Sequence, residues 1–485
     1  MFVYDPKTNT LASYSGKSLP PKLQIFMNVD LQRFFSACNP SHTLMMEDAE
    51  DRKYYIDFAS VRGGKVIDAL KRTIARLSPN QPTCQLFTGH IGCGKSTELS
   101  RLKTELMEEG FHVVYFESTQ DLDATDLDVT DIMLAIARQL SESLEESQIA
   151  LQPQGFKAFL KGAWDFLQTP VEIKAEGELF GSKIQGSTEG NLEFSLPMGI
   201  AKITAKTKDS PKTRSQLRQY LEPQTNKILQ LINEEIIAVA IAQLKQQGKK
   251  GLVAIVDNLD RVENRATASG RMLPDYIFID RGEQLRKLNC HVVYTIPLGL
   301  IFSNDGATLQ NRLGGGIDPK VLPMVPVQSR DGSEYAEGMK LLRQMVLARA
   351  FPETKPEERL GLMAEVFETP ETLDRLCQIS GGHVRNLLGM LYRCLQEEDP
   401  PISAAVLEAV IRDARDRLLL SIDNDEWELL FQVVQEQKVK GDGEYQTLLR
   451  SLFVFEYHDS EGRWFGINPL LKETDKFKGW LMANG

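Results

Sequence analysis

The sequence Gly89-His90-Ile91-Gly92-Cys93-Gly94-Lys95-Ser96 is the most informative part of this chain. It matches the phosphate-binding pattern G-x-x-x-x-G-K-[ST] at every fixed position. Residues 84–88 before it form a short apolar run. Residues 97–109 after it repeat leucine on one helical face and lead to Gly110, which is suited to terminate a helix. The predicted order of strand, glycine-rich turn and helix is the context in which this pattern acquires meaning.

The pattern has a direct chemical interpretation. Glycines allow backbone N–H groups to turn inward around phosphate oxygens, and the start of the following helix adds partial positive charge. Lys95 would reach the β- and γ-phosphates, and Ser96 would offer its hydroxyl to Mg²⁺. The sequence therefore predicts a nucleoside triphosphate site formed by Gly89, His90, Ile91, Gly92, Cys93, Gly94, Lys95, Ser96 and Thr97.

Composition limits the other functions that this chain could have. Its 485 residues suffice for two to four domains with their own cores. The formal net charge of −11 gives no support to a general polyanion-binding role. The six cysteines and six histidines are scattered, with no C-x-x-C pair, so a zinc site is not expected.

The sequence also bears on location. Three of the cysteines lie in apolar runs and are expected to be reduced core residues. No segment reaches the ~18 uninterrupted apolar residues that a membrane-spanning helix requires. The first residues lack the charged-then-apolar layout of a signal peptide. We therefore expect a cytoplasmic protein with no membrane partner.

The order of apolar patterns predicts an α/β fold. Further strands are expected at residues 112–117, 252–256, 291–296 and 322–327. They are continuous apolar runs separated by helical patterns, which is typical of a parallel sheet covered on both faces. The predicted units are an unassigned N-terminal arm at 1–54, a core at 55–332 with an insertion at 150–222, a helical lid at 333–416 and a C-terminal unit at 417–485.

The insertion is predicted to contain β-hairpins. Residues 171–174 and 200–204 alternate between apolar and polar side chains, and glycine, serine and asparagine separate them. The end of the insertion is basic, with Lys202, Lys206, Lys208, Lys212, Arg214 and Arg218. It is the better candidate in this chain for a nucleic-acid contact, although a solvated basic hairpin is the simpler interpretation. A long helix is predicted to follow over 223–247.

Asp257 closes the apolar run 252–256. A carboxylate at the end of a strand that neighbours the phosphate-loop strand could hold Mg²⁺ through water, opposite Ser96. A core strand followed by a surface aspartate is the alternative, because such runs are common. The phosphate loop favours the metal role.

The segment Asp257-Asn258-Leu259-Asp260-Arg261 resembles the D-[DE]-x-D segment of the signal-transduction (STAND) branch of P-loop ATPases, which are relatives of the AAA+ proteins. In AAA+ proteins the residue after the metal-binding aspartate is usually a glutamate that polarises the attacking water. Asn258 cannot act as a base. The resemblance therefore implies either that Asp260 substitutes for this glutamate or that hydrolysis is slow.

Further segments resemble the same family in the same chain order. Val61-Arg62-Gly63-Gly64 implies that Arg62 helps to enclose the adenine, and Thr295 corresponds to the sensor of the γ-phosphate or attacking water. Arg312 corresponds to a finger directed at a neighbour's nucleotide. Arg385, within residues 380–386, corresponds to the lid arginine that contacts the γ-phosphate. An ordinary strand-end threonine and a solvated loop arginine are the alternatives for Thr295 and Arg312.

Residues 421–471 predict two amphipathic helices followed by a two-stranded ribbon, and this order resembles a winged helix. Some winged helices bind DNA through the second helix and the ribbon. From Leu418 to Gly485, however, seven Lys and Arg face twelve Asp and Glu, a balance of −5. Since DNA binding draws much of its affinity from phosphate neutralisation, a protein-contact or autoinhibitory role is favoured.

Together these resemblances imply an ATPase switch with a parallel-sheet P-loop NTPase core, a β-hairpin insertion, a helical lid and a C-terminal winged helix. ATP and Mg²⁺ would bind between core and lid, and nucleotide state would control self-association or the engagement of protein partners. Bacterial proteins of this kind often serve in antiviral defence or stress signalling. The alternatives are an initiator or loader that encircles DNA, and a scaffold that binds ATP without hydrolysing it.

Overall fold

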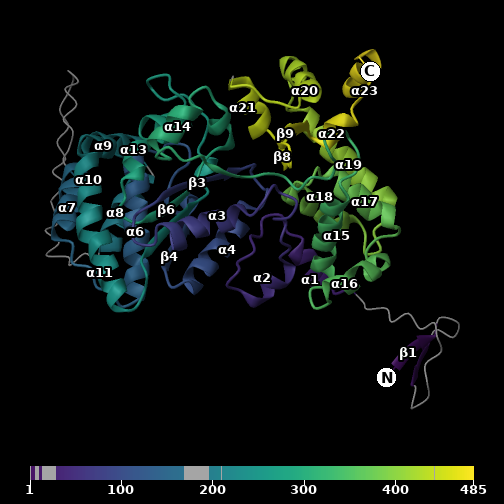
Figure 1. Cartoon of the computed structure of the whole chain (residues 1–485), viewed down its shortest axis with the longest axis horizontal. Coiled ribbons are helices and arrows are strands. Elements are labelled where there is room, and N and C mark those ends of the chain that lie inside the picture. Colours follow the sequence, from purple (N-terminus) through teal and green to yellow (C-terminus); the bar gives the residue numbers. More distant parts are fainter. Residues whose placement is uncertain are drawn as a thin grey trace, which may run out of the picture.

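The structure is a computed structural model that describes residues 2–5, 10–13, 29–168, 196–208, 210–441 and 443–484. Its centre is a five-stranded parallel sheet in the order β4-β5-β6-β3-β7 (Figure 1). The strands are β3 (Cys84–Gly89), β4 (His112–Glu117), β5 (Leu252–Asp257), β6 (His291–Thr295) and β7 (Lys320–Leu322). The predicted α/β fold with a parallel sheet is confirmed.

The sheet order corrects one prediction. The phosphate-loop strand β3 pairs with β6 and β7, whereas β5 pairs with β4 and β6. The strand that ends at Asp257 is therefore not the neighbour of β3, because β6 lies between them. Asp257 still lies at the same edge of the sheet as the phosphate loop, since the carboxyl ends of parallel strands share one edge of a sheet.

Helices cover both faces of the sheet, which explains why the strands are continuous apolar runs. Val253 and Ile255 of β5 belong to the core formed with α3 (Val66–Arg72) and α4 (Lys95–Glu108). Ala254 and Val256 face the opposite core, which is formed with α6 (Val129–Glu146) and α11 (Ala238–Gln246). All six residues of β5 are buried.

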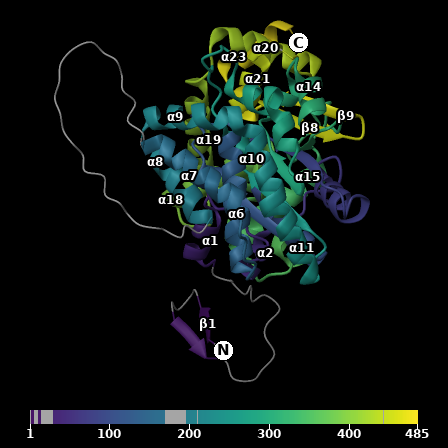
Figure 2. The same ribbon diagram turned by 90° about the vertical axis from the view of Figure 1, so that its left-hand side faces the viewer.

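The insertion is helical where the structure describes it. It contains α7 (Gln154–Gln168), α8 (Leu196–Lys208) and α9 (Pro211–Leu221), which gather beside α6 in Figure 2. The next helix, α10 (Thr225–Leu231), lies within the helical segment predicted over 223–247. The predicted strand at 200–204 is wrong, because it lies within α8. Leu196, Ile200 and Ile203 are buried there at helical spacing. The other predicted strand, at 171–174, lies outside the described residues.

The basic end of the insertion is largely engaged with acidic partners where its side chains are described. Arg214 contacts Asp123 at 2.8 Å, and Arg218 contacts Asp126 at 3.0 Å. Both carboxylates belong to the loop between β4 and α6. These contacts weaken the case for a nucleic-acid surface at Arg214 and Arg218.

The N-terminal segment is more ordered than the sequence predicts. Strands β1 (Phe2–Asp5) and β2 (Thr10–Ser13) form an antiparallel pair, and α1 (Leu31–Ala37) and α2 (Ala49–Tyr54) follow. Arg33 of α1 forms a 2.9 Å ion pair with Glu353, which lies just beyond α15 (Ala336–Ala350). The backbone N–H of Met46 donates to Ser100 of α4 over 2.8 Å. This segment therefore bridges α15 and the helix of the phosphate loop.

Beyond the sheet the chain is first helical and then mixed. The lid helices, a name used below for α15 to α19, also include α16 (Pro356–Arg359), α17 (Pro370–Ile379), α18 (Val384–Glu397) and α19 (Ala404–Leu419). The C-terminal module contains α20 (Asn424–Glu436), α21 (Gly443–Arg450), the antiparallel strands β8 (Val454–Asp459) and β9 (Gly462–Ile467), α22 (Pro469–Lys472) and α23 (Asp475–Asn484). Figure 1 shows this module above the sheet and the lid helices.

The remaining short helices connect these parts. They include α5 (Ser118–Asp121), α12 (Leu273–Asp275), α13 (Gly282–Arg286) and α14 (Gly306–Arg312), and the helical turns Leu259–Arg261 and Leu298–Phe302. Within the ranges that the structure covers, no helix combines the length and apolar character needed to cross a membrane.

Candidate nucleotide-binding site

The phosphate loop depends on backbone shapes that glycine supplies. Gly92 has a φ of +87°, and Gly94, which caps the start of α4, has a φ of +104°. Side chains disfavour this left-handed region, and glycine enters it without steric cost. At Gly92 there is a second reason, because a Cβ atom would lie 2.8 Å from His383 and 2.9 Å from Arg385. The loop therefore packs closely under the start of α18.

Lys95 points into the loop and is fully engaged there. Its ammonium donates to the carbonyl oxygens of Gly89 and His90, each over 2.8 Å, and forms a 3.0 Å ion pair with Asp260. Burial would lower the pKa of Lys95, but the nearby carboxylate of Asp260 outweighs it and the pKa is raised. The ammonium is held charged next to the glycine-rich backbone.

The predicted metal-binding pair is brought together. Ser96, at the start of α4, hydrogen-bonds to Asp257 at the end of β5. Asp257 also accepts from the hydroxyl of Tyr115 at 2.9 Å and from the backbone N–H of Asn258 at 2.7 Å. Burial raises the pKa of Asp257, and the hydrogen bond from Ser96 opposes that rise. A hydroxyl and a carboxylate in contact at a strand edge fit the donor set that Mg²⁺ uses beside nucleotides.

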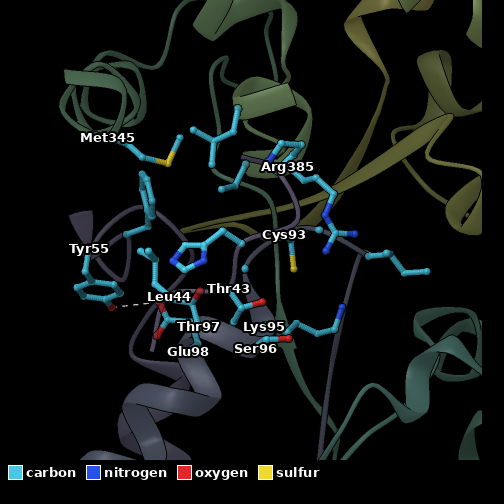
Figure 3. A pocket seen from close by; sticks show the side chains of 18 of the residues that line it. Thr43, Leu44, Tyr55, Cys93, Lys95, Ser96, Thr97, Glu98, Met345 and Arg385 are labelled. Carbon is cyan, nitrogen blue, oxygen red and sulfur yellow. Dashed lines mark hydrogen bonds between the residues drawn. The ribbon is translucent and has the colours of Figure 1, made fainter. Parts of the chain in front are cut away.

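A cavity with about 870 Å³ of empty space opens above the loop (Figure 3). Part of this space is open solvent, so the lining residues, and not the volume, indicate the ligand. Five basic side chains line it against two acidic ones, namely Arg62, Lys95, Arg261, Arg349 and Arg385 against Glu98 and Asp260. This excess suits a ligand that carries several negative charges.

One wall of the cavity comes from residues to which the sequence assigned no function. Thr43 and Leu44 of the N-terminal segment, together with Tyr55, face Met345 of α15 across the cavity. Arg349, also on α15, donates to the backbone oxygen of Tyr54 over 2.6 Å. The available sequence signals were the aspartate caps of α1 and α2, Asp30 and Asp48, which mark helices but not a site.

Two predicted arginines reach the cavity, and two others that line it, Arg261 and Arg349, were not predicted. Arg62 donates to the backbone oxygen of Cys93 over 2.9 Å, and burial lowers its pKa. The backbone N–H of Arg385 donates to Gly92 over 3.2 Å. Burial lowers the pKa of Arg385, and the charge of Arg261 lowers it further. Arg261 directly follows Asp260 and lines the same cavity, but it was not predicted as a site residue.

Two other predicted residues do not converge on the cavity. The hydroxyl of Thr295 is buried, accepts from the backbone N–H of Leu259 over 3.0 Å and donates to Val256 over 3.3 Å. It stabilises the turn after β5, so the geometry does not support contact with a γ-phosphate. Arg312 is exposed at the end of α14 and contacts the backbone oxygen of Ile279 at 3.4 Å.

His90 and Ile91 connect the phosphate loop to other parts of the chain. The ring of His90 accepts a 2.9 Å hydrogen bond from the backbone N–H of Glu456 in β8. The backbone oxygen of Ile91 is 2.8 Å from the ring nitrogen of His383, which precedes α18. These contacts join the phosphate loop to the lid helices and to the C-terminal module.

The sheet, the glycine-rich loop and the buried lysine define a P-loop NTPase domain. The family described as the KAP family P-loop domain matches residues 64–269, which include β3, β4, the insertion and β5. No curated protein matches the chain.

Two solved structures are similar in outline. One is the ORC2 protein of Aeropyrum pernix in ADPNP-ADP complexes, at 12% identity over 86% of this chain and 94% of that chain, with a TM-score of 0.36. The other is Cdc6p from Pyrobaculum aerophilum, at 12% identity over 92% of this chain and 98% of that chain, with a TM-score of 0.35. A likeness this weak supports no inference about function.

Proposed function

We propose that this chain is a regulatory ATPase that binds ATP and Mg²⁺, hydrolyses ATP slowly, and uses its nucleotide state to set the positions of the lid helices and of the C-terminal module. The cavity supports this proposal because it is walled by the core, the N-terminal segment and the lid helices together. A ligand in it would contact all three. Its occupancy would therefore bias their arrangement.

The chain's residues suit ATP in defined ways. Backbone N–H groups of Gly92 to Thr97 would face the phosphates, with Lys95, Arg261 and Arg385 as cations around them. Ser96 and Asp257 would hold Mg²⁺, which neutralises charge on the phosphates when bound. Leu44, Tyr55 and Met345 would contact the base, as apolar and aromatic side chains do in nucleotide pockets.

The observation that carries the regulatory role is a three-way contact behind the phosphate loop. The ring of Phe455 in β8 lies 5.9 Å from the ring of His90 and 5.8 Å from the ring of His383. His90 belongs to the phosphate loop and His383 to the loop before Arg385. A shift of either loop on nucleotide binding would therefore be felt by the ribbon of the C-terminal module.

The position of the C-terminal module favours a switch over a DNA-binding initiator. A winged helix binds DNA through its second helix and its ribbon. Here α21 packs on the turn Leu298–Phe302. Gln446 of α21 lies so close to Gly299 that a Cβ atom at Gly299 would be 3.2 Å from its side chain. The ribbon turn is bound by Arg330 through Asp459 at 2.6 Å and abuts Gly63. Both candidate DNA-binding surfaces therefore contact the rest of the chain.

Hydrodynamic size measured without nucleotide, with ADP and with ATP, beside a phosphate-release assay, tests the proposal. We expect size to differ between ATP and ADP, with slow release, and Lys95→Ala to abolish both effects. Identical sizes in all states, with release stimulated by DNA and suppressed by salt, would instead establish the initiator or loader. Tight ATP binding without phosphate release would establish the scaffold.

A further inference from the structure

All three hydrogens of the Lys95 ammonium already have acceptors in this chain. Two are the carbonyl oxygens of Gly89 and His90, and the third is the carboxylate of Asp260 at 3.0 Å. A lysine has three donors and no more. The side chains of Lys95 and Asp260 are 6% and 4% exposed, so water is not a substitute partner. A phosphate can gain Lys95 only if one of these acceptors gives it up.

Asp260 is the acceptor that can leave. The two carbonyls belong to the backbone of the loop itself, whereas Asp260 lies on the short turn Leu259–Arg261 after β5. Its second carboxylate oxygen, Oδ1, is buried without any hydrogen-bond partner. Asp260 also lines both the nucleotide cavity and a neighbouring cavity that Gly89 and His90 line as well. One of its oxygens therefore holds the lysine while the other is unused.

We propose that Asp260 is a latch on Lys95 that becomes the general base of hydrolysis when ATP displaces it. The inference rests on the proposed function. The β- and γ-phosphates of ATP take Lys95 from Asp260, because they carry more charge than one carboxylate. The carboxylate that is released lies beside the terminal phosphate with both oxygens free. The base therefore exists only when a triphosphate is bound.

The other polar groups near the phosphates are unsuited to this role. Glu98 is the second carboxylate that lines the cavity, but Tyr55 and Arg101 occupy it, each at 3.1 Å. Asp257 is occupied by Tyr115, Asn258 and Ser96. Asn258 carries a neutral amide that cannot accept a proton at ordinary pH. Asp260 alone combines a cavity position with a free oxygen among the cavity-lining carboxylates.

The chemical step balances with ATP and water alone. The oxygen of water forms a bond to the γ-phosphorus, and the bond between that phosphorus and the bridging oxygen breaks. The electron pair of the broken bond stays on the terminal oxygen of ADP. Asp260 accepts the proton of the attacking water and later passes it to phosphate or solvent, so the base is regenerated.

Asp260→Asn and Glu263→Gln provide a matched test, because each replaces a carboxylate that lines the neighbouring cavity by an amide of the same shape. Titration with ATP and with AMP measures the latch, and phosphate release measures the base. For Asp260→Asn we expect ATP to bind about 10-fold tighter, since a charge-assisted contact no longer competes. AMP, which lacks the phosphates that contact Lys95, should bind unchanged. Phosphate release should fall by about 100-fold or more.

Glu263→Gln should change ATP affinity by less than about 3-fold, since Glu263 is exposed and does not line the nucleotide cavity. Weaker or unchanged ATP binding by Asp260→Asn would overturn the proposal that Asp260 holds Lys95 in the absence of ATP. Undiminished phosphate release would overturn the proposal that Asp260 is the general base. If the asparagine variant does not fold, Asp260→Ala is measured by the same criteria. If the unmodified chain binds ATP without turnover, the base and the proposed ATPase both fail. The affinity comparison then still decides the latch.

Discussion

The ring of His90 accepts a 2.9 Å hydrogen bond from the backbone N–H of Glu456, a residue 366 positions away in the chain. Burial lowers the pKa of His90 to about 3, so the ring is neutral near pH 7 and can act as an acceptor. The first variable residue of the phosphate loop is thus a direct support of the C-terminal ribbon. This contact gives the switch a physical path that can be tested.

Replacing His90 by Phe keeps an aromatic ring against Phe455 but removes the acceptor for Glu456. A buried N–H without a partner costs about 1–3 kcal/mol. We therefore expect amide hydrogen exchange of β8 to accelerate by about 5-fold or more. His112→Phe is the control, because His112 contacts Ser143 on the far side of the sheet. Equal exchange in β8 for both variants would show that the His90 contact does not hold the ribbon.

Gly92→Ala should weaken ATP binding, because the added methyl group causes steric contacts in addition to backbone strain. The added Cβ would meet His383 at 2.8 Å and Arg385 at 2.9 Å. Gly316 supplies a matched control, since its φ of +88° equals that of Gly92 within a degree and a Cβ there meets nothing within 4 Å. Each alanine should cost about 1–2 kcal/mol of strain. Thermal unfolding and ATP titration separate the effects, and only Gly92→Ala should lose affinity.

The sequence predicted the parts whose signal is local. The phosphate loop, Asp257 and the apolar strands follow from short patterns, and the structure brings Ser96 and Asp257 together. Strand order was not predictable in the same way. Nothing in β5 or β6 indicates that β6, and not β5, pairs with β3. The pairing depends on the path of the connecting helices.

Other errors arose where two periodicities coincide or where contacts are remote. Ile200 and Ile203 are three residues apart, which places them on opposite faces of a strand but on one face of a helix, and Leu196 extends that helical face. The N-terminal segment shows no periodicity because isolated side chains anchor it. For example, the backbone oxygen of Tyr54 accepts a hydrogen bond from the side chain of Arg349, which is 295 positions away in the chain. Such single contacts leave no repeating sequence signal.

Glu456 should make stability depend on pH. Burial raises its pKa to about 7 from an ordinary 4.5, although the ion pair with Arg463 at 2.6 Å opposes that rise. The folded chain therefore binds more protons than the unfolded chain between about pH 4.5 and 7. Stability should fall as pH rises through this window and level off above it. The free energy of unfolding should fall by on the order of 3 kcal/mol at most across this window.

Glu456→Gln should remove this loss. The free energy of unfolding in urea at several pH values measures it as the difference between the variant and the unmodified chain. That difference is needed because His90 and His383, with pKa values lowered by burial to about 3 and about 4, act in the opposite sense as pH falls below 6.5. Parallel pH curves for the two proteins would show that Glu456 titrates normally.

Arg330 and Arg375 provide a paired test of whether the ribbon turn supports the nucleotide site. Arg330 binds Asp459 of the ribbon turn through contacts of 2.6 and 3.0 Å. Arg375 of α17 binds Glu408 of α19 at 2.7 Å and Glu473, at the end of α22, at 2.5 Å. Both pairs are partly exposed, so each alanine should cost about 1 kcal/mol of stability.

Their effects on nucleotide binding should differ. Loosening the ribbon turn frees β8, which contacts His90 of the phosphate loop, whereas the ion pairs of Arg375 among the described residues lead to α19 and to the end of α22. Arg330→Ala should therefore accelerate the dissociation of a fluorescent ATP analogue by several-fold, and Arg375→Ala should leave it unchanged. Equal dissociation rates for the two variants would show that the ribbon turn does not support the nucleotide site. The contact between the phosphate loop and the ribbon would then be structural only.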